Sequence, residues 1–288
     1  MILDSINSPE DLRALPIEKL PELAQEIREL IITTTAENGG HLAPNLGVVE
    51  LTLALHYVFD TPKDKIIWDV GHQSYAHKII TGRREQFATI RKEGGLSGFC
   101  SKNESEYDCF TTGHSSNSLS LAMGMAEARD LRGEDNKIIA IIGDGAISGG
   151  MALEALNHAG DIETPFLVVL NDNEMSINHN VGALNRYLSH IRSHPKYSKA
   201  KNNVHHFLDR IPLIGQPLAN FISGFKNGIK SLLVPGMFFE YLGFTYLGPT
   251  DGHNINELVD ILRQAATIQR PVLLHTITVK GKGYQPAE

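Results

Sequence analysis

The sequence predicts an α/β fold in which helices cover both faces of a mainly parallel sheet. Short apolar segments typical of buried strands alternate with longer segments whose apolar residues recur at helical spacing. The chain has 288 residues, of which 42% are hydrophobic, enough for a sizeable core. It contains no internal repeat and no low-complexity tract. The predicted strands cover residues 65–73, 137–142, 165–170 and 271–279.

The predicted helices lie mainly in the first 160 residues. Ser8, Pro9 and Asp11 together form a helix start, with a capping hydroxyl, a proline at the first helical position and an acid three residues after the cap. A longer amphipathic helix is expected from Glu18 to Glu37, and it should end at Gly39-Gly40. Further helices are expected at residues 47–59, 114–133 and 149–160.

Basic residues outnumber acidic ones between Arg186 and Lys230. This span holds eight Lys and Arg residues against one acid, Asp209. One interpretation is an irregular, solvated surface insertion. The other is a mobile basic flap that attracts phosphorylated ligands into a nearby cleft. We place this insertion at about residues 183–236, within a single domain that spans residues 1–288. The basic residues are Arg186, Arg192, Lys196, Lys199, Lys201, Arg210, Lys226 and Lys230.

Composition excludes several classes of protein. A net charge of −7 argues against a protein built mainly to bind nucleic acid. Cys100 and Cys109 make no disulfide framework, and no paired Cys/His spacing indicates a zinc site. The N-terminus lacks the features of a secretory signal, and the apolar runs are too short to span a bilayer. The sequence therefore predicts a soluble cytoplasmic protein with no nucleic-acid or membrane partner.

Two acidic clusters stand at the ends of neighbouring predicted strands. Gly143-Asp144-Gly145 follows one strand, Asn171-Asp172-Asn173 follows the next, and a single helix lies between them. In a right-handed βαβ unit both clusters lie at the carboxyl edge of the sheet, where ligands of such folds bind. Carboxylate and amide oxygens suit Mg²⁺, and the start of the intervening helix suits a phosphate. Either cluster alone is typical of a simple turn, but the pair predicts a Mg²⁺-diphosphate site.

Gly-His dipeptides are over-represented. The chain has four, whereas 26 glycines and 13 histidines in 288 residues would give about one by chance. Each falls at the end of a predicted element, so we expect the loops that carry them to meet at one edge of the sheet. Imidazoles near a ligand move protons and donate hydrogen bonds to carbonyl or phosphate oxygens, although a lone histidine more often has a structural role. The dipeptides are Gly40-His41, Gly71-His72, Gly113-His114 and Gly252-His253.

These motifs resemble those of thiamin diphosphate enzymes of the transketolase type. In that signature the GDG aspartate and the last asparagine of NDN hold the metal, with a backbone carbonyl two residues on; the matching positions are Asp144, Asn173 and Met175. Along its whole length the chain is similar, more specifically, to the 1-deoxy-D-xylulose-5-phosphate synthase family. The stretches that carry this resemblance include "GGHLAPNLGVVELTLALHYVF", "WDVGHQSYAHKIITGR", "TTGHSSNS", "GPTDGHN" and "KGKGYQPAE".

The resemblance implies thiamin diphosphate and Mg²⁺ as cofactors. It implies that His41 and His253 face the substrates as catalytic residues. Tyr284 would close over the cofactor, and packing on the domain is the alternative for this residue. The sequence departs from the family pattern at Asn117 of "GHSSNS" and at Pro44-Asn45. The implied cofactor-binding residues are His72, Gly113, His114, Ser115, Asp144, Gly145, Ala146, Asn173 and Tyr284.

The implied reaction condenses pyruvate with D-glyceraldehyde 3-phosphate to 1-deoxy-D-xylulose 5-phosphate and CO₂, a step that feeds isoprenoid and thiamin synthesis. No segment resembles the family's second and third domains, and the second supplies the glutamate that contacts the cofactor ring. We therefore expect this chain alone to have little activity, and the ring-binding domain to act in cis or as a separate subunit of a homodimer. Two alternatives stay open: an N-terminal subunit of a transketolase-type enzyme, and a non-catalytic thiamin diphosphate binder.

Overall fold

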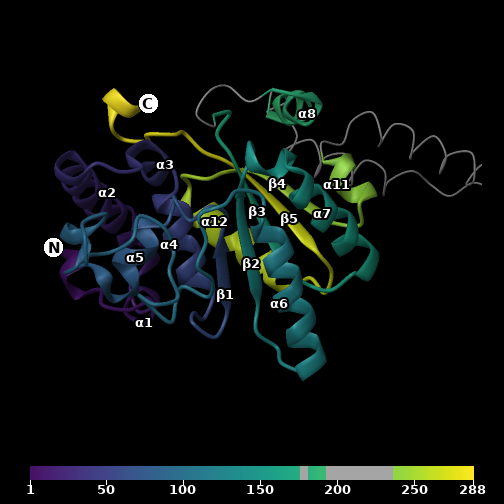
Figure 1. The fold of residues 1–288 in the computed structure, drawn as a ribbon, viewed down its shortest axis with the longest axis horizontal. Helices are drawn as coiled ribbons and strands as arrows, with labels where there is room; N and C mark the ends of the chain where they lie inside the picture. The colour runs from purple at the N-terminus through teal and green to yellow at the C-terminus, as the bar shows by residue number, and fades with distance from the viewer. Residues whose placement is uncertain (176–180, 193–235) are drawn as a thin grey trace, which may run out of the picture.

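The computed structural model describes residues 1–175, 181–192 and 236–288 of the chain. In these residues five strands form one sheet, in the order β1-β2-β3-β5-β4, and every neighbouring pair is parallel (Figure 1). The predicted α/β class is therefore confirmed. The strands are β1 (Lys65–Trp68), β2 (Ile138–Gly143), β3 (Leu167–Asp172), β4 (Thr245–Asp251) and β5 (Val272–Ile277).

The five helices that the sequence predicts all form, with ends that differ by a few residues. The capping box at the first helix is present, because the Ser8 side chain accepts from the Asp11 amide and the Asp11 carboxylate accepts from the Ser8 amide. Gly39 ends the long second helix with a positive φ. The helices are α1 (Pro9–Arg13), α2 (Leu20–Asn38), α3 (Leu42–Leu46), α4 (Val49–Val58), α5 (Tyr75–Lys78), α6 (Ser118–Arg132), α7 (Gly150–Ile162), α8 (Ala183–Arg192), α11 (Met237–Tyr241) and α12 (Ile255–Thr267).

Both faces of the sheet are covered. Side chains alternate along the strands, so Ile139 and Ile141 belong to one core while Ile138 and Ile142 belong to the other. The first core also contains the apolar residues of α2, α4 and α12, and the second contains those of α6, α7 and α11. Figure 1 shows these two groups of helices on opposite sides of the sheet.

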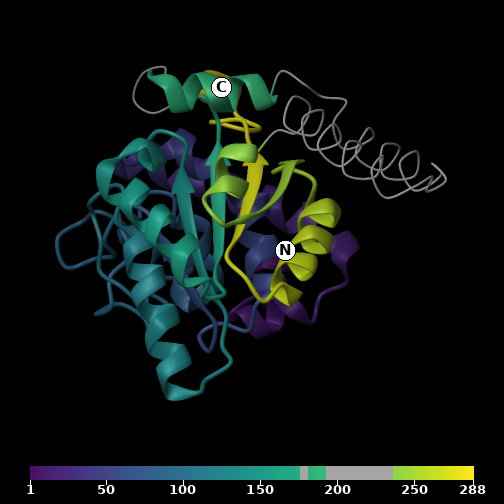
Figure 2. The same cartoon turned by 90° about the vertical axis from the view of Figure 1, so that its right-hand side faces the viewer.

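The β2–α7–β3 unit has the geometry that the two acidic clusters, Gly143–Gly145 and Asn171–Asn173, require. Strands β2 and β3 are adjacent, and Gly143 at the end of one pairs with Asn171 of the other. The Asp144 amide also donates to the Asn171 carbonyl at 3.1 Å. In Figure 2 the strand arrows point towards the end of the molecule where α8 and the C-terminus lie. The polar clusters that follow the strands therefore lie at that end.

Several elements differ from the sequence prediction. Helix α12 and the short helices α3, α5 and α11 were not predicted, and strand β1 ends at Trp68 rather than at residue 73. Strand β4 was not predicted, because Gly248-Pro249 interrupts its pattern; it is an edge strand, the position in a sheet that tolerates proline, and its register shifts between Leu247 and Thr250. Helix α6 begins at Ser118 rather than at residue 114, because the preceding residues form a loop. Residues 183–192 form helix α8, with Leu188 and Ile191 buried, rather than irregular chain. The rest of the predicted insertion lies outside the described residues.

Gly160 in α7 gives a test of this packing. A Cβ at this position would lie 1.5 Å from the Leu242 carbonyl oxygen, so Gly160→Ala should cost about 1–3 kcal/mol through overpacking. That cost exceeds the roughly 1 kcal/mol by which alanine favours a helix over glycine. Gly124 in α6 is the matched control, since no described atom lies within 4 Å of its Cβ position. Urea unfolding should show a lower midpoint for Gly160→Ala and a higher one for Gly124→Ala; a rise in both would contradict the packing.

Candidate functional site

Asp144 and Asn173 stand at the carboxyl ends of adjacent strands, as the sequence predicts. Asp144 lies in the turn after β2 and is buried, with 4% of its surface exposed. Asn173 follows β3, and its side-chain oxygen accepts a hydrogen bond from the Met175 amide at 3.0 Å. This Asx turn fixes the direction of the backbone from Asn173 to Met175. Oxygen atoms from both turns thus lie at one edge of the sheet.

The two residues before Asn173 are buried and held by the neighbouring segments. The Asp172 carboxylate bonds to His275 Nε2 at 2.9 Å and to the Arg192 guanidinium of α8. The Asn171 side-chain oxygen accepts from the Thr278 hydroxyl at 2.6 Å, while its Nδ2 has no hydrogen-bond partner among the described residues. These bonds hold the Asp172 carboxylate in place, so it stabilises the turn. The Asn171 amide nitrogen, in contrast, can donate to an acceptor.

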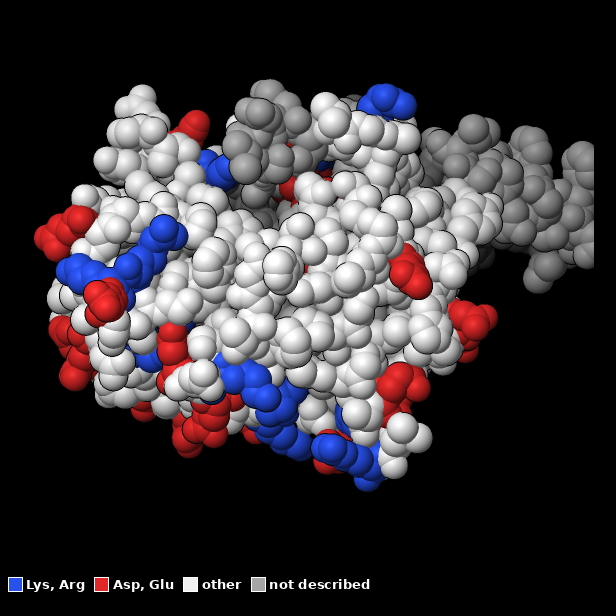
Figure 3. Space-filling view, in the orientation of Figure 1, with Lys and Arg blue, Asp and Glu red and all other residues white. Residues whose placement is uncertain are grey.

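Of the eight basic residues of the predicted insertion, two lie in the described part of the chain, Arg186 and Arg192. The Arg192 side chain is 9% exposed and turned inward, in contact with Asp172 and, at 2.8 Å, with Glu174. Burial works to lower the pKa of Arg192, but Asp172, Glu174 and Asp144 raise it above its ordinary value. Helix α8 thus brings a positive charge to the carboxyl edge. Figure 3 shows a hollow at this end of the molecule with charged side chains in it.

The Gly113–Ser115 loop is tied to the Asp144 turn. Asp69, directly after β1, accepts hydrogen bonds from the Ser116 and Ser118 amides at 2.8 and 3.1 Å. The Ser116 hydroxyl donates to the Ala146 carbonyl at 2.7 Å. Gly149 packs so closely on Ser116 that a Cβ would lie 2.2 Å from its Oγ. The exposed Gly113, His114 and Ser115 are consequently held beside the segment that contains Gly145 and Ala146.

The loops of His41 and His72 are brought together by Asn45. Its side-chain nitrogen donates to the carbonyls of both histidines at 2.7 Å, and its oxygen accepts from the Tyr75 amide at 2.8 Å. The two imidazole rings consequently meet edge to face with centroids 5.6 Å apart. Asn45, a departure from the family pattern, is fully buried and serves as the link between two predicted site residues.

Both of these histidines are held neutral at neutral pH. Burial, aided by electrostatic interaction with His41 and Lys280, lowers the pKa of His72 to about 4. Burial and Arg91 also lower the pKa of His41. The Nδ1 atoms of both rings are buried and have no hydrogen-bond partner among the described residues. Each ring therefore has a nitrogen that can bond to a ligand oxygen or to a proton donor.

The lowered pKa of His72 should make stability depend on pH. The unfolded chain takes up a proton near pH 6.5 and the folded site only near pH 4, so stability falls as pH drops through this window. At pH 5 the loss should be about 1–2 kcal/mol. His72→Gln removes the titration, so the difference in urea midpoint between pH 7 and pH 5 should shrink. An unchanged difference would show that His72 does not titrate as its surroundings require.

His253 and Tyr284 have different settings. His253 uses both ring nitrogens within the chain: Nδ1 bonds to Glu50 at 3.0 Å, and Nε2 accepts from the Val279 amide at 2.8 Å. Tyr284 is half-buried and packs against the core on the α2 and α4 side of the sheet. The described contacts join neither residue to the His41–His72 pair. The catalytic and cofactor-binding roles of these residues stay predictions.

A buried cluster of potential metal ligands lies behind the His72 loop. His77, Cys100 and Asp108 have ligand atoms within 4.8 Å of one another. However, Asp108 is held by two hydrogen bonds from Arg83, at 2.7 and 2.9 Å, and by one from His77. Burial raises the pKa of Cys100 to about 12, so the thiol stays protonated. These contacts make the cluster an ion-pair network rather than a metal centre.

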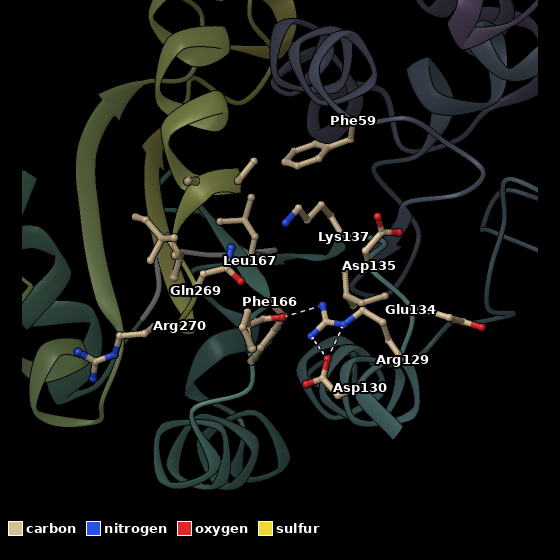
Figure 4. Close-up of a pocket in the computed structure, with 16 residues that line it drawn as sticks. Phe59, Arg129, Asp130, Glu134, Asp135, Lys137, Phe166, Leu167, Gln269 and Arg270 are labelled. Carbon is tan, nitrogen blue, oxygen red and sulfur yellow. Dashed lines mark hydrogen bonds and ion pairs between the residues drawn. The ribbon is translucent and has the colours of Figure 1, made fainter. Parts of the chain in front are cut away.

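A pocket of about 330 Å³ opens at the opposite edge of the sheet, beside the first residues of β2, β3 and β5. Figure 4 shows Lys137 pointing into it, towards Phe59 and Leu167. Arg129, also in its wall, is committed to Asp130 and to the Pro165 carbonyl. The predicted site residues do not line this pocket, so it is separate from the candidate site.

No helix in the described part of the chain is long and apolar enough to cross a membrane.

The sequence prediction missed the residues that hold the site together. Asp69 lies inside the predicted strand 65–73, and a carboxylate within a predicted buried strand is the signal that could have identified it, because such a group is seldom buried unless it is paired. Glu50 is the single acid in a mostly apolar helix, a pattern that often marks a buried, paired carboxylate. Asn45 and Ser116 carry no such signal, because their partners lie in distant loops.

The arrangement of sheet and helices matches the fold of transketolases. Over 93% of this chain and 39% of that chain, the transketolase from Campylobacter jejuni subsp. jejuni NCTC 11168 superposes with a TM-score of 0.67 at 22% identity. The transketolase from Leishmania mexicana gives a TM-score of 0.63 at 19% identity, over 93% of this chain and 37% of that chain. These similarities establish the fold class and nothing about the substrate.

The family follows from the sequence comparisons. A family model described as 1-deoxy-D-xylulose-5-phosphate synthase matches residues 3–278. The synthase of that name from Desulforudis audaxviator is 61% identical over all of this chain, and that from Carboxydothermus hydrogenoformans is 59% identical. The chain belongs to the 1-deoxy-D-xylulose-5-phosphate synthase family, which confirms the resemblance. It spans 45% and 46% of the length of these two relatives.

Proposed function

We propose that this chain holds the diphosphate end of thiamin diphosphate together with Mg²⁺, at the carboxyl edge of β2 and β3. Asp144, the side-chain oxygen of Asn173 and the carbonyl of Met175 would hold the cation. The observation that carries the proposal is the buried Asp144 carboxylate in a turn bonded to the end of the adjacent strand, beside the Asn173 turn. Hard oxygen donors of this kind suit Mg²⁺ shared with phosphate oxygens.

The surrounding donors fit a diphosphate. The Asn171 Nδ2 and His72 Nδ1 atoms are buried and have no hydrogen-bond partner among the described residues. No described atom lies within 4 Å of the Cβ position of Gly143 or Gly150, so the backbone there can approach a ligand closely. Gly150 begins α7, whose first N–H groups favour an anion. The Gly113–Ser115 loop, Gly145 and Ala146 complete the proposed cradle, with Tyr284 over it.

We further propose the reaction of the family for a protein that contains this chain. When bound, thiamin diphosphate supplies carbanion chemistry at a 2-oxo acid. Pyruvate would lose CO₂ and be joined to D-glyceraldehyde 3-phosphate, giving 1-deoxy-D-xylulose 5-phosphate. His41, neutral and with an Nδ1 atom that has no partner among the described residues, would exchange hydrogen bonds or a proton with substrate oxygens. The ring of the cofactor and the aldehyde phosphate would be bound by segments equivalent to the rest of the relatives' length, in a homodimer.

Turnover by a chimera tests this proposal. The chain would replace the equivalent segment of the Desulforudis audaxviator relative, to which it is 61% identical. With thiamin diphosphate, Mg²⁺, pyruvate and D-glyceraldehyde 3-phosphate, the chimera should release CO₂ and form 1-deoxy-D-xylulose 5-phosphate. Transfer between sugar phosphates instead would indicate a transketolase-type enzyme. Tight cofactor binding by the chain, with no turnover in a folded chimera, would indicate a non-catalytic binder.

A further inference from the structure

A chain of hydrogen bonds crosses four segments on one side of the candidate site. Arg28 of α2 donates to one oxygen of Glu50 in α4 at 2.5 Å. The other oxygen of Glu50 bonds to His253 Nδ1 at 3.0 Å, and His253 Nε2 accepts from the Val279 amide at 2.8 Å. The side chains of Arg28, Glu50 and His253 are 6, 11 and 11% exposed. These three residues form what we call the Arg28 relay.

The hydrogen-bond partners of His253 determine which ring nitrogen carries the proton. The Val279 amide can only donate, so Nε2 must accept and the proton must lie on Nδ1, where it is donated to Glu50. Burial alone would raise the pKa of Glu50, but the bond from His253 and the charge of Arg28 outweigh burial and lower it. Glu50 is therefore ionised, and an ionised carboxylate orients the imidazole. With both nitrogens used, His253 has none left to exchange a proton with a substrate.

The relay holds a short segment, residues 279–284, which we call the strap. Val279 begins the strap and is bound by His253. In its middle, the Gly281 amide donates to the Ala43 carbonyl at 2.9 Å, two residues from His41. Near its end, Gly283 packs on Arg28, where a Cβ would lie 2.8 Å from the Arg28 Cδ. Both ends of the strap therefore rest on the same relay.

We propose that Arg28, Glu50 and His253 are positioning residues that fix the strap, and with it Tyr284, against the domain. His253 consequently acts through Val279 rather than on a substrate. The first half of this inference concerns the chain alone. The second half, that the strap's position determines the affinity for thiamin diphosphate, rests on the proposed function of Tyr284.

Hydrogen exchange of the Val279 amide in the ligand-free chain tests the first half. His253→Ala removes the acceptor and should raise the exchange rate at least about tenfold. His253→Gln places an acceptor near the Nε2 position and should retain most of the protection, whereas His253→Asn reaches only towards Glu50 and should not. Leu273 and Leu274 in β5 serve as internal controls for the fold, since their amides belong to the sheet. Unchanged exchange at Val279 in the alanine variant would overturn the proposal.

The second half is tested by the affinity for thiamin diphosphate and by turnover in the chimera described above. His253→Ala should raise the dissociation constant of thiamin diphosphate about tenfold or more, while kcat at saturating cofactor stays close to the parent value. His253→Gln should restore most of the affinity. A fall in kcat at saturation, with unchanged affinity and no rescue by glutamine, would assign His253 a direct proton-transfer role and overturn the proposal. If the parent chain binds no thiamin diphosphate, the proposed function fails, while the exchange experiment still decides the role of His253.

Discussion

Replacement of Asp144 by asparagine should weaken Mg²⁺-dependent binding of thiamin diphosphate about a hundredfold or more. The substitution keeps the size of the side chain and removes the negative charge that would face the cation. The turn itself should survive, because its bond to β3 is made by the Asp144 amide and not by the side chain. Calorimetric titration with thiamin diphosphate at a fixed Mg²⁺ concentration measures the change; about a hundredfold corresponds to roughly 2.7 kcal/mol.

Asp161 is the matched control for this substitution. It lies near the other end of α7, is exposed, and loses the same charge in Asp161→Asn. We expect this variant to bind thiamin diphosphate as the parent chain does, because a solvated charge at that distance is screened. Equal affinities for the Asp144 and Asp161 variants would remove Asp144 from the site.

Replacement of Asp108 by alanine should lower the free energy of unfolding by about 3–5 kcal/mol. Asp108 is 3% exposed and accepts hydrogen bonds from Arg83, from the Ser101 amide and from His77. Its loss leaves the buried Arg83 guanidinium without its principal counter-charge. Urea unfolding at neutral pH measures the effect. The exposed carboxylate of Asp135, paired with Lys63, is the control, and Asp135→Ala should change the midpoint little.

The Asp108 carboxylate should also make the free energy of unfolding fall at acid pH. Burial alone would raise the pKa of Asp108, but His77 and Arg83 outweigh burial and hold it well below its ordinary value of 3.8. The stabilisation is therefore fully present above about pH 4 and is lost as pH falls below that value. In Asp108→Ala this part of the acid dependence should disappear. If the variant and the parent lose stability in parallel below pH 4, Asp108 is not the group responsible.

Much of the sheet could be predicted because strands β1, β2, β3 and β5 are continuous apolar runs between turn residues. Strand β4 could not, because its glycine and proline are compatible with a strand only at an edge, and a sequence does not reveal which strand is at the edge. Helix α8 was likewise missed, because its basic residues suggested solvated chain. Arg192 is instead buried against Asp172, a partner twenty residues earlier.

The candidate site, like the fold, could be predicted only in part. Asp144 and Asn173 could be placed from the sequence because strand ends in a βαβ unit fix where the residues that follow them lie. The contacts that hold the loops could not be placed, since the partners are remote in sequence: Asp69 bonds to an amide 47 residues away, and Glu50 to a histidine 203 residues away. The pairing of His41 with His72 depends on Asn45, whose two bonds span separate loops.

The most direct test of the proposed site is a calorimetric titration of the purified chain with thiamin diphosphate and, separately, with thiamin, each with Mg²⁺ and with a chelator. If the carboxyl edge of β2 and β3 binds a Mg²⁺-diphosphate group, thiamin diphosphate should bind with Mg²⁺, and both removal of the metal and removal of the diphosphate should abolish binding. Binding of thiamin as tight as that of thiamin diphosphate, or binding that persists in the chelator, would contradict this assignment.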